Sequence, residues 1–162
     1  MNLMITGGAG FIGANLVLHW LCHHPDDLVV NFDALTYAGN LENLQEIKNH
    51  PNYRFVLGDL RNSLDISKAF SKHAIDAVIH LAAESHVDRS IHGPADFVET
   101  NITGTFNLLE TSRKYWSDDL STHRFLHVST DEVYGSLGSK GKFLETTAYA
   151  PNSPYSASKA GS

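Results

Sequence analysis

Short apolar runs and amphipathic stretches alternate along this chain from its first residues. Runs rich in Val, Ile and Leu are typical of strands buried in a parallel sheet. The stretches between them place apolar residues three and four positions apart, which is typical of helices that cover such a sheet. The pattern predicts strands at 3–6, 28–32, 53–60, 74–83 and 123–129, and helices at 11–21, 41–47, 63–70, 94–116 and from 155 onward.

This order of elements predicts a Rossmann-type α/β fold, a doubly wound parallel sheet with right-handed crossovers. Ligands of such sheets bind beyond the carboxyl ends of the strands, so the residues after each strand are the candidates for function. The helix at 94–116 is expected to place Thr100, Asn101 and Thr105 on the ligand side and to bury an apolar face formed by Phe97, Ile102, Phe106, Leu108, Leu109 and Tyr115. The segment 136–142 is expected to be a flexible loop.

Three glycines follow the first predicted strand with the spacing Gly7-x-x-Gly10-x-x-Gly13. Glycine is needed where the backbone has a positive φ or must approach a ligand closely. A helix that begins here would direct free N–H groups and the positive end of its dipole at a phosphate. The spacing therefore fits a dinucleotide pyrophosphate site, and an ordinary glycine-rich turn remains the alternative.

Asp33 ends the second predicted strand, twenty residues after Gly13. A carboxylate at this position of a dinucleotide fold accepts hydrogen bonds from the ribose hydroxyls of adenosine, and it would repel a 2′-phosphate. Because Ala34 rather than an arginine follows, the sequence favours NAD over NADP. An aspartate that stabilises a turn is the alternative. After the third strand, Asp59 and Leu60 are placed to lie beside the adenine, although Asp59 can equally cap the next helix.

Composition excludes several classes of function. The chain has 162 residues and a net charge of −6, so it lacks the basic surface of a nucleic-acid-binding protein. Its single cysteine, Cys22, forms no internal disulfide and fits a reducing compartment. No apolar run is long enough for a membrane span, and the N-terminus does not resemble a signal peptide. We therefore expect a cytoplasmic protein without membrane or nucleic-acid partners.

A polar segment follows the fourth predicted strand. Small Ala82 and Ala83 would let a cofactor ring lie close, and Glu84, His86 and Asp88 come next. These three side chains can suggest a metal, but their spacing on a loop is weak support, and we expect none. A substrate-contacting loop that uses His86, Asp88 and Arg89 is the preferred interpretation.

Tyr155 and Lys159 lie four residues apart, on one face of the last predicted helix. An ammonium near a phenol stabilises the phenolate and lowers the pKa of the tyrosine. Tyr155 is therefore a candidate acid/base for a substrate hydroxyl, and Lys159 can also hold the nicotinamide ribose.

Together, these motifs resemble the extended short-chain dehydrogenase/reductase family. The match is carried by Thr-Gly-Gly-Ala-Gly-Phe-Ile-Gly at 6–13, His-Leu-Ala-Ala at 80–83 and the Tyr155/Lys159 pair. Four further motifs resemble the nucleotide-sugar 4,6-dehydratases within that family: Leu-Thr-Tyr-Ala-Gly-Asn-Leu at 35–41, Glu-Ser-His-Val-Asp-Arg-Ser at 84–90, Ser-Thr-Asp-Glu-Val-Tyr-Gly at 129–135 and Ser-Pro-Tyr-Ser-Ala-Ser-Lys at 153–159.

The resemblance implies NAD as cofactor and dTDP-glucose as substrate. It implies that Tyr155 takes the proton of the sugar 4-hydroxyl and that Glu132 takes the proton on carbon 5. It also implies that Asp131 protonates the departing 6-hydroxyl and that Thr130 binds the 4-oxygen. It places the cofactor against Gly7, Gly10, Phe11, Ile12, Gly13, Asp33, Ala34, Leu35, Thr36, Asp59, Leu60, Leu81, Ala82, Ala83, Ser85, Thr100, Tyr155 and Lys159. It places the substrate against Ser85, His86, Asp88, Arg89 and Thr130.

Two alternatives stay open, an epimerase or decarboxylase of the same fold and a non-catalytic NAD-binding fragment. Without the resemblance, Asp131 and Glu132 would be taken as an exposed turn. For Thr130, Asp131 and Glu132 all to reach a sugar, the strand at 123–129 must end or twist near Ser129, because neighbouring strand residues face opposite ways.

Proteins of this family are much longer. We therefore expect 1–162 to be the NAD-binding Rossmann domain, incomplete at its C-terminal end and without the substrate domain. The helix that carries Tyr155 is expected to be marginal at this length. The resemblance implies a homodimer built on the helices at 94–116 and 155 onward, and we expect this chain alone to bind NAD weakly and to have little activity.

Overall fold

The structure is a computed structural model that describes residues 1–117 and 119–162. It forms two compact units, which are described separately below. The first contains residues 1–82 and 107–128, and the second contains residues 83–106 and 129–162. No helix among the described residues has the length and apolar character needed to cross a bilayer.

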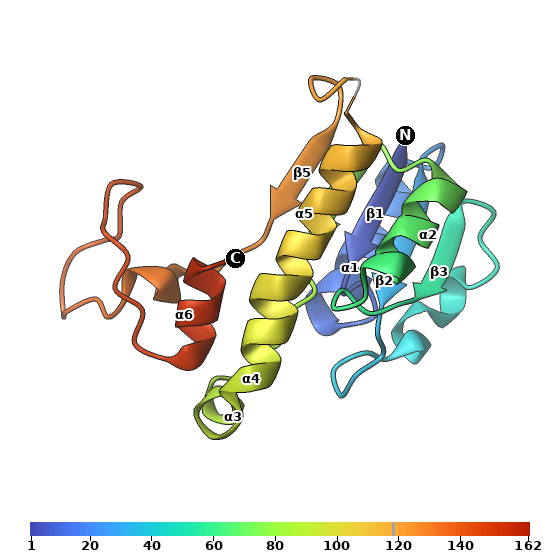
Figure 1. The fold of residues 1–162 in the computed structure, drawn as a ribbon. Helices are drawn as coiled ribbons and strands as arrows, with labels where there is room; N and C mark the ends of the chain where they lie inside the picture. Colours follow the sequence, from blue (N-terminus) through green and yellow to red (C-terminus); the bar gives the residue numbers. More distant parts are fainter. Residues whose placement is uncertain (118) are drawn as a thin grey trace. The chain divides into compact units, whose positions relative to one another are not determined.

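The first unit is built on one parallel sheet with the strand order β3-β2-β1-β4-β5 (Figure 1). Its strands are β1 (Asn2–Thr6), β2 (Leu28–Asp33), β3 (Tyr53–Leu57), β4 (Ala77–His80) and β5 (Arg124–His127). In register, Thr6 of β1 pairs with His80 of β4, which pairs with His127 of β5, so these strands end at one edge. The predicted Rossmann-type α/β fold is confirmed.

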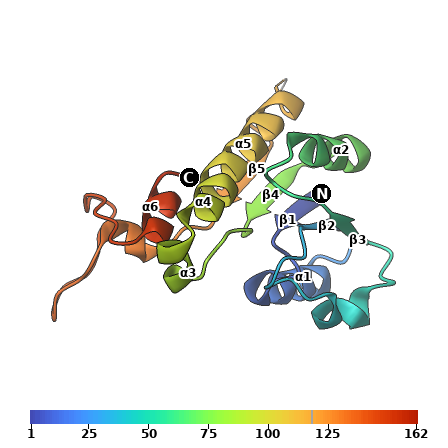
Figure 2. The same cartoon turned by 60° about the horizontal axis from the view of Figure 1, so that its bottom comes forward.

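Helices cover both faces of this sheet (Figure 2). On one face, α1 (Phe11–His23) and the 3-10 turns of η1 (Leu41–Ile47) pack on a core that includes Leu3, Ile5 and Val29. On the other face, α2 (Ser63–His73) and the part of α5 (Gly104–Tyr115) in this unit pack on a core that includes Met4 and Val78. Leu3, Met4 and Ile5 face opposite sides in turn because strand side chains alternate.

The second unit is mainly helical. It contains α3 (Val87–His92), α4 (Pro94–Phe97), the π-helical η2 (Val98–Thr103), the 3-10 turn η3 (Asp131–Tyr134) and α6 (Pro154–Ala160). The sequence predicted one regular helix over 94–116. The helix does begin at Pro94, where proline is tolerated at the first position, but its second turn is π-helical. α3 was missed, because 84–90 was taken as a loop.

Several boundaries and burial predictions need correction. β3 ends at Leu57 and β4 covers only Ala77–His80, so both are shorter than predicted. Within the predicted apolar face of 94–116, Phe97 and Leu108 are buried, whereas Phe106, Leu109 and Tyr115 are exposed. The prediction that the last strand stops near Ser129 is confirmed, since β5 ends at His127.

The residues on either side of the predicted loop 136–142 pack against one another. The ring of Tyr134 lies 5.3 Å from that of Phe143 and 5.4 Å from that of Tyr149, measured between centroids. The Ala150 N–H donates to the carbonyl oxygen of Val133 at 3.0 Å. These contacts join the two ends of the loop, and no periodic pattern in the sequence predicts them.

Candidate functional site

The glycine-rich loop of the first unit lies close against the end of β4. Gly7 has a φ of +70°, and a Cβ on it would lie 2.8 Å from the backbone nitrogen of Ala82. The Thr6 hydroxyl oxygen accepts the N–H groups of Leu81 and Ala82, each at 3.2 Å. Only glycine satisfies both the backbone angle and this approach, so Gly7, Leu81 and Ala82 form one continuous backbone surface.

The first turn of α1 leaves its backbone N–H groups open. Gly10 precedes the helix and provides no side-chain cap, and the first turn carries no acidic residue. Phe11 and Ile12 are 83% and 65% exposed although they are large and apolar. Uncapped N–H groups at a helix N-terminus favour a negatively charged group, so this turn fits a pyrophosphate.

Asp33 stabilises two segments, of which the sequence indicated only the turn that follows it. One carboxylate oxygen accepts the Ala9 N–H at 2.9 Å and the other accepts the Leu35 N–H at 2.8 Å. The side chain is only 8% exposed, and Leu35 has a φ of +50°. Asp33 therefore does stabilise a turn, and it also fixes the glycine-rich loop. Each oxygen keeps a lone pair for a ribose hydroxyl, and Ala34 and Thr36 beside it are exposed.

Asp59 and Leu60 differ in availability. The Arg61 guanidinium donates to both oxygens of Asp59 and holds the pKa of that carboxyl below its usual value. The Leu60 side chain is buried in the core, and its backbone carbonyl oxygen accepts a hydrogen bond from the Asn107 amide at 3.0 Å. Neither Asp59 nor Ser63 caps α2, because the Asn62 side chain accepts the Leu64 N–H at 3.1 Å.

In the second unit, four of the predicted catalytic residues come together: Thr130, Asp131, Glu132 and Tyr155. Thr130 precedes η3, where Asp131 and Glu132 form the first exposed turn, and its hydroxyl oxygen accepts the Glu132 N–H at 3.3 Å. Thr130 also hydrogen-bonds the Tyr155 side chain, and the charges of Asp131 and Glu132 act on that phenol. Because three residues separate the end of β5 from the start of η3, the side chains of Thr130, Asp131 and Glu132 are not bound to the alternation of a strand.

The pKa of Tyr155 does not follow the sequence-based expectation. Burial raises it, and the nearby charges of Glu132 and Asp131 raise it further, while the hydrogen bond with Thr130 lowers it. The expected lowering by an ammonium was wrong for this structure, because desolvation and the two carboxylates outweigh the hydrogen bond with Thr130, and Lys159 is not among the causes of the shift.

Lys159 is deeply buried on α6, with only 6% of its surface exposed. Burial lowers the pKa of its ammonium to about 8. The short helix that carries it is stabilised at its start by Pro154 and by a reciprocal capping box between Ser153 and Ser156. These local signals compensate for a length at which an isolated helix is marginal.

The predicted substrate residues Ser85, His86, Asp88 and Arg89 are all exposed, around the start of α3. Ala83 and Thr100, which were predicted to contact the cofactor, are half-buried in this unit. Within the described part of the chain, no three His, Cys, Asp or Glu side chains are arranged to hold a metal ion.

Asn101 connects the segments that carry these residues. Its side-chain amide donates to the carbonyl oxygen of Glu84 at 2.9 Å and to the Ser158 hydroxyl at 2.8 Å, and its carbonyl accepts the Glu84 N–H at 2.9 Å. Asn101 is 1% exposed. The sequence placed it on the ligand side, whereas it holds the loop before α3 to α6.

Replacing Asn101 by leucine is expected to destabilise the protein by about 2–4 kcal/mol, because three hydrogen bonds are lost and their partners stay partly buried. Urea unfolding measures the change. The control is Asn15→Leu, whose exposed amide bonds only the Phe11 carbonyl and whose replacement should change stability by less than about 0.5 kcal/mol. Equal effects would show that the Asn101 bonds contribute little.

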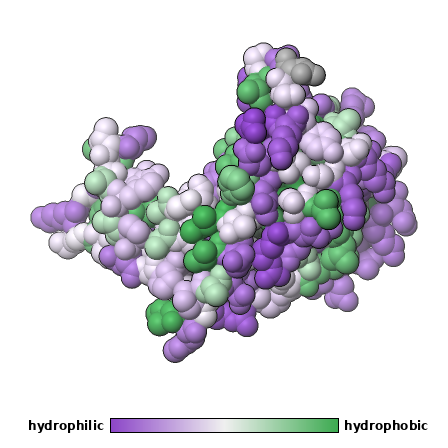
Figure 3. Space-filling model, in the orientation of Figure 1, coloured by the Kyte–Doolittle hydropathy of each residue, from purple (hydrophilic) through white to green (hydrophobic). Residues whose placement is uncertain are grey.

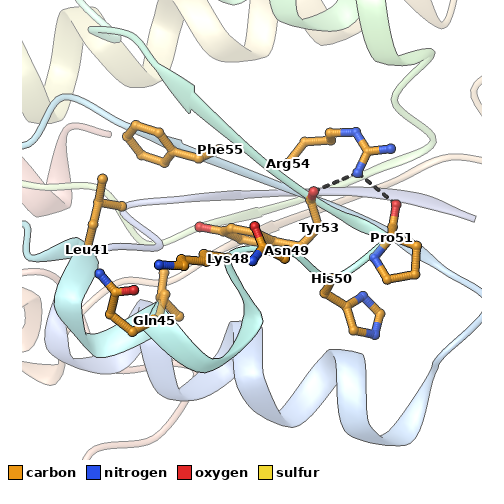
Figure 4. Close-up of a pocket in the computed structure, with 10 residues that line it drawn as sticks. Leu41, Gln45, Lys48, Asn49, His50, Pro51, Tyr53, Arg54 and Phe55 are labelled. Atoms are coloured by element: carbon orange, nitrogen blue, oxygen red, sulfur yellow. Dashed lines mark hydrogen bonds between the residues drawn. The ribbon is translucent and has the colours of Figure 1, made fainter.

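A separate groove of about 750 Å³ opens beside β3 in the first unit (Figure 4). Arg54 turns toward Pro51 there and donates to the carbonyl oxygens of Pro51 and Tyr53, both at 2.7 Å. None of the predicted site residues lines this groove. Its walls are formed by Leu41, Leu44, Gln45, Lys48, Asn49, His50, Pro51, Tyr53, Arg54 and Phe55.

Curated relatives match the whole chain. A dTDP-glucose 4,6-dehydratase of Salmonella typhimurium is 54% identical over 175 residues, which cover 100% of this chain and 48% of that protein. A probable dTDP-glucose 4,6-dehydratase of Sinorhizobium fredii is 54% identical over 167 residues, which cover 100% of this chain and 47% of that protein. The chain thus spans about half the length of the curated relatives it matches.

Solved structures agree with these relatives. A dTDP-glucose 4,6-dehydratase from Streptomyces venezuelae, solved with NAD, is 47% identical with a TM-score of 0.90, covering 99% of this chain and 49% of that chain. A UDP-glucose 4-epimerase from Thermus thermophilus, solved with NAD, is 33% identical with a TM-score of 0.85. The match covers 99% of this chain and 48% of that chain. A family model described as GDP-mannose 4,6 dehydratase matches residues 4–162. The resemblance read from the motifs is therefore confirmed, and the chain belongs to the family of nucleotide-sugar dehydratases that this model describes.

Proposed function

We propose that this chain supplies the NAD-binding part and the main catalytic residues of an NAD-dependent dTDP-glucose 4,6-dehydratase. The product would be dTDP-4-keto-6-deoxyglucose. The observation that carries the proposal is the cluster in which Thr130 hydrogen-bonds Tyr155 beside Asp131 and Glu132. The curated relatives, which carry this activity in their names, support the substrate.

The residues of the first unit fit NAD. The glycine-rich loop forms a backbone surface that side chains would obstruct, α1 offers uncapped N–H groups, and Asp33 keeps lone pairs for ribose hydroxyls. A carboxylate at Asp33 disfavours a 2′-phosphate, which favours NAD over NADP. When bound, NAD would accept hydride from sugar carbon 4 and return it to carbon 6.

In the second unit, each catalytic side chain has a distinct task. Thr130 would hold the sugar 4-oxygen while Tyr155 takes the 4-hydroxyl proton. The resulting 4-ketone acidifies the proton on carbon 5, which Glu132 would remove for the elimination and would give back to carbon 5 when hydride returns to carbon 6. Asp131 would protonate the departing 6-hydroxyl, so that water leaves. Two adjacent carboxyl groups can have opposite roles when one is protonated and the other ionised in the complex.

An epimerase is the second candidate, since the Thermus thermophilus relative shares the fold. An epimerase oxidises and reduces the same sugar carbon, so it needs Tyr155, Lys159 and Thr130 but no acid and base for elimination. Asp131 and Glu132, both exposed at the start of η3, favour dehydration.

The deciding experiment incubates the complete polypeptide that carries these residues with dTDP-glucose and NAD. We expect a 4-keto-6-deoxy sugar, detected by mass spectrometry as the loss of one water. A product of unchanged mass with inverted carbon 4 would establish the epimerase instead. A parallel titration of the 162-residue chain with NAD should show weak binding and little turnover. Complete absence of binding would favour a non-catalytic fragment.

A homodimer and a cytoplasmic location complete the proposal. Val98 and Phe106 of the second unit expose large apolar side chains along η2 and the start of α5, and apolar patches interrupt a largely hydrophilic surface (Figure 3). A helix pair of two copies would cover such side chains. The single cysteine supports a reducing compartment.

A further inference from the structure

Asn31 is a polar residue inside the apolar core of the first unit. It lies on β2 opposite Ile5 of β1, and its exposed fraction is 0%. Asn31 and Asp33 are two positions apart, so both side chains face the same side of the sheet. Since Asp33 bonds the N–H of Ala9, this side of β2 supports the glycine-rich loop.

The Asn31 side chain lies directly beneath Gly8. A Cβ on Gly8 would collide with Oδ1 of Asn31, and its three nearest atoms all belong to the Asn31 amide. Gly8 in turn supports the start of α1, because a Cβ on Gly13 would lie 2.7 Å from the Gly8 α-carbon. Asn31 thus contacts the loop, and the loop contacts the helix that offers its N–H groups.

Tyr53 determines how the Asn31 amide is oriented. The Nδ2 group of Asn31 donates to the Tyr53 hydroxyl at 3.0 Å, which leaves Oδ1 facing Gly8. Tyr53 is 7% exposed at the start of β3, and burial raises its pKa, so the phenol stays neutral. Its ring also forms part of the groove beside β3.

Oδ1 of Asn31 is buried and accepts no hydrogen bond. An apolar side chain in place of Asn31 would fill the same space without burying an acceptor that has no hydrogen bond. However, a carbonyl oxygen carries no hydrogens and tolerates a Cα–H contact at about 3.3–3.6 Å, closer than the packing of two saturated carbons. An amide oxygen at this position can therefore lie closer to the Gly8 α-carbon than a leucine or valine side chain could.

We propose that Asn31 and Tyr53 are positioning residues for the dinucleotide site. Tyr53 orients the Asn31 amide, and Asn31 sets the height of Gly8 and thereby the place of the α1 N–H groups. The inference rests on the proposed binding of NAD by this loop.

The first test compares Tyr53→Phe with Tyr115→Phe in the intact protein. Tyr115 is the matched control, because its hydroxyl donates to the Ser67 carbonyl on the helical side of the same unit. Loss of the Tyr53 hydroxyl should raise the Kd for NAD by roughly threefold to tenfold and leave kcat at saturating NAD unchanged. Without NAD, amide hydrogen exchange should become faster at residues 7–13 and stay unchanged in β1 and β4. The control should show neither effect.

A double-mutant cycle tests the contact with Gly8 itself. Gly8 does not have a positive φ, so the collision with Asn31 is the obstacle to an alanine there. Gly8→Ala alone should weaken NAD binding severely, and Asn31→Ala/Gly8→Ala should recover much of the loss. Equal losses in the single and double variants would overturn the proposal.

The readouts separate this inference from the proposed function. If the wild-type protein binds no NAD, the proposal of NAD as cofactor is wrong. Independently of that result, unchanged amide hydrogen exchange at residues 7–13 in Tyr53→Phe would overturn the inference about Asn31 and Tyr53. A uniform rise in exchange across the sheet, or faster loop exchange with unchanged NAD affinity, would also overturn it.

Discussion

Glu132→Gln is expected to lower dehydratase turnover by about a hundredfold to ten-thousandfold, the usual contribution of a positioned general base. Glutamine keeps the size of the side chain, and the Glu132 N–H can still bond the Thr130 hydroxyl, so η3 should stay intact. The amide cannot accept the proton from sugar carbon 5. Oxidation of carbon 4 uses Tyr155 instead, so the variant should still form reduced nicotinamide while releasing little product.

Stopped-flow absorbance of reduced nicotinamide and product analysis by mass spectrometry measure the two steps separately. Glu145→Gln is the matched control, because Glu145 is exposed in the segment after η3 and has no assigned role. It should retain full turnover. A Glu132→Gln variant within a few-fold of wild type would identify Asp131 and Glu132 as an exposed turn.

Lys159→Met is expected to stabilise the fold while abolishing turnover. Burial lowers the pKa of Lys159 from 10.5 to about 8. This shift means that keeping the lysine charged in the folded protein costs about 3 kcal/mol of stability at neutral pH. Methionine has a similar length and no charge to desolvate, so its free energy of unfolding at pH 7 should be higher than that of wild type. Such opposition between stability and activity is common where a functional group is buried.

The pH dependence gives this prediction its sign. Between about pH 8 and 10.5 the unfolded lysine binds a proton that the native one has lost, so the wild type gains stability as the pH rises. The advantage of Lys159→Met should therefore be largest at pH 7 and shrink toward pH 10. Urea unfolding at both pH values measures it, with Lys72→Met on the exposed side of α2 as control. A variant less stable than wild type at pH 7 would mean that the buried ammonium makes net favourable contacts.

The fold was predictable because its signals are local and repeat. The spacing of apolar residues predicts strands such as 28–32 and helices such as 11–21. The glycines at 7, 10 and 13 indicate the loop between β1 and α1. The catalytic role expected for Tyr155 came from the resemblance to family motifs, since the spacing of Tyr155 and Lys159 alone is weak.

The features that were missed depend on contacts between distant residues. Asn101 meets Glu84 and Ser158 across 17 and 57 positions of sequence, and nothing in the helical pattern around it announces those bonds. The pKa of Tyr155 depends on how deeply the phenol is buried, which spacing cannot supply. Asn31 read as an ordinary strand residue, because its role comes from Gly8 and Tyr53.

The two hydrogen bonds of Asp33 limit how cofactor preference can be redesigned. Accepting a 2′-phosphate would require removing this carboxylate, yet the same carboxylate fixes Ala9 and the turn at Leu35. Replacing Asp33 alone by a neutral residue would loosen the glycine-rich loop, and this would weaken the binding of NAD and of NADP alike. A switch to NADP in this scaffold therefore demands a substitute acceptor for the Ala9 N–H, introduced together with the new phosphate-binding cation.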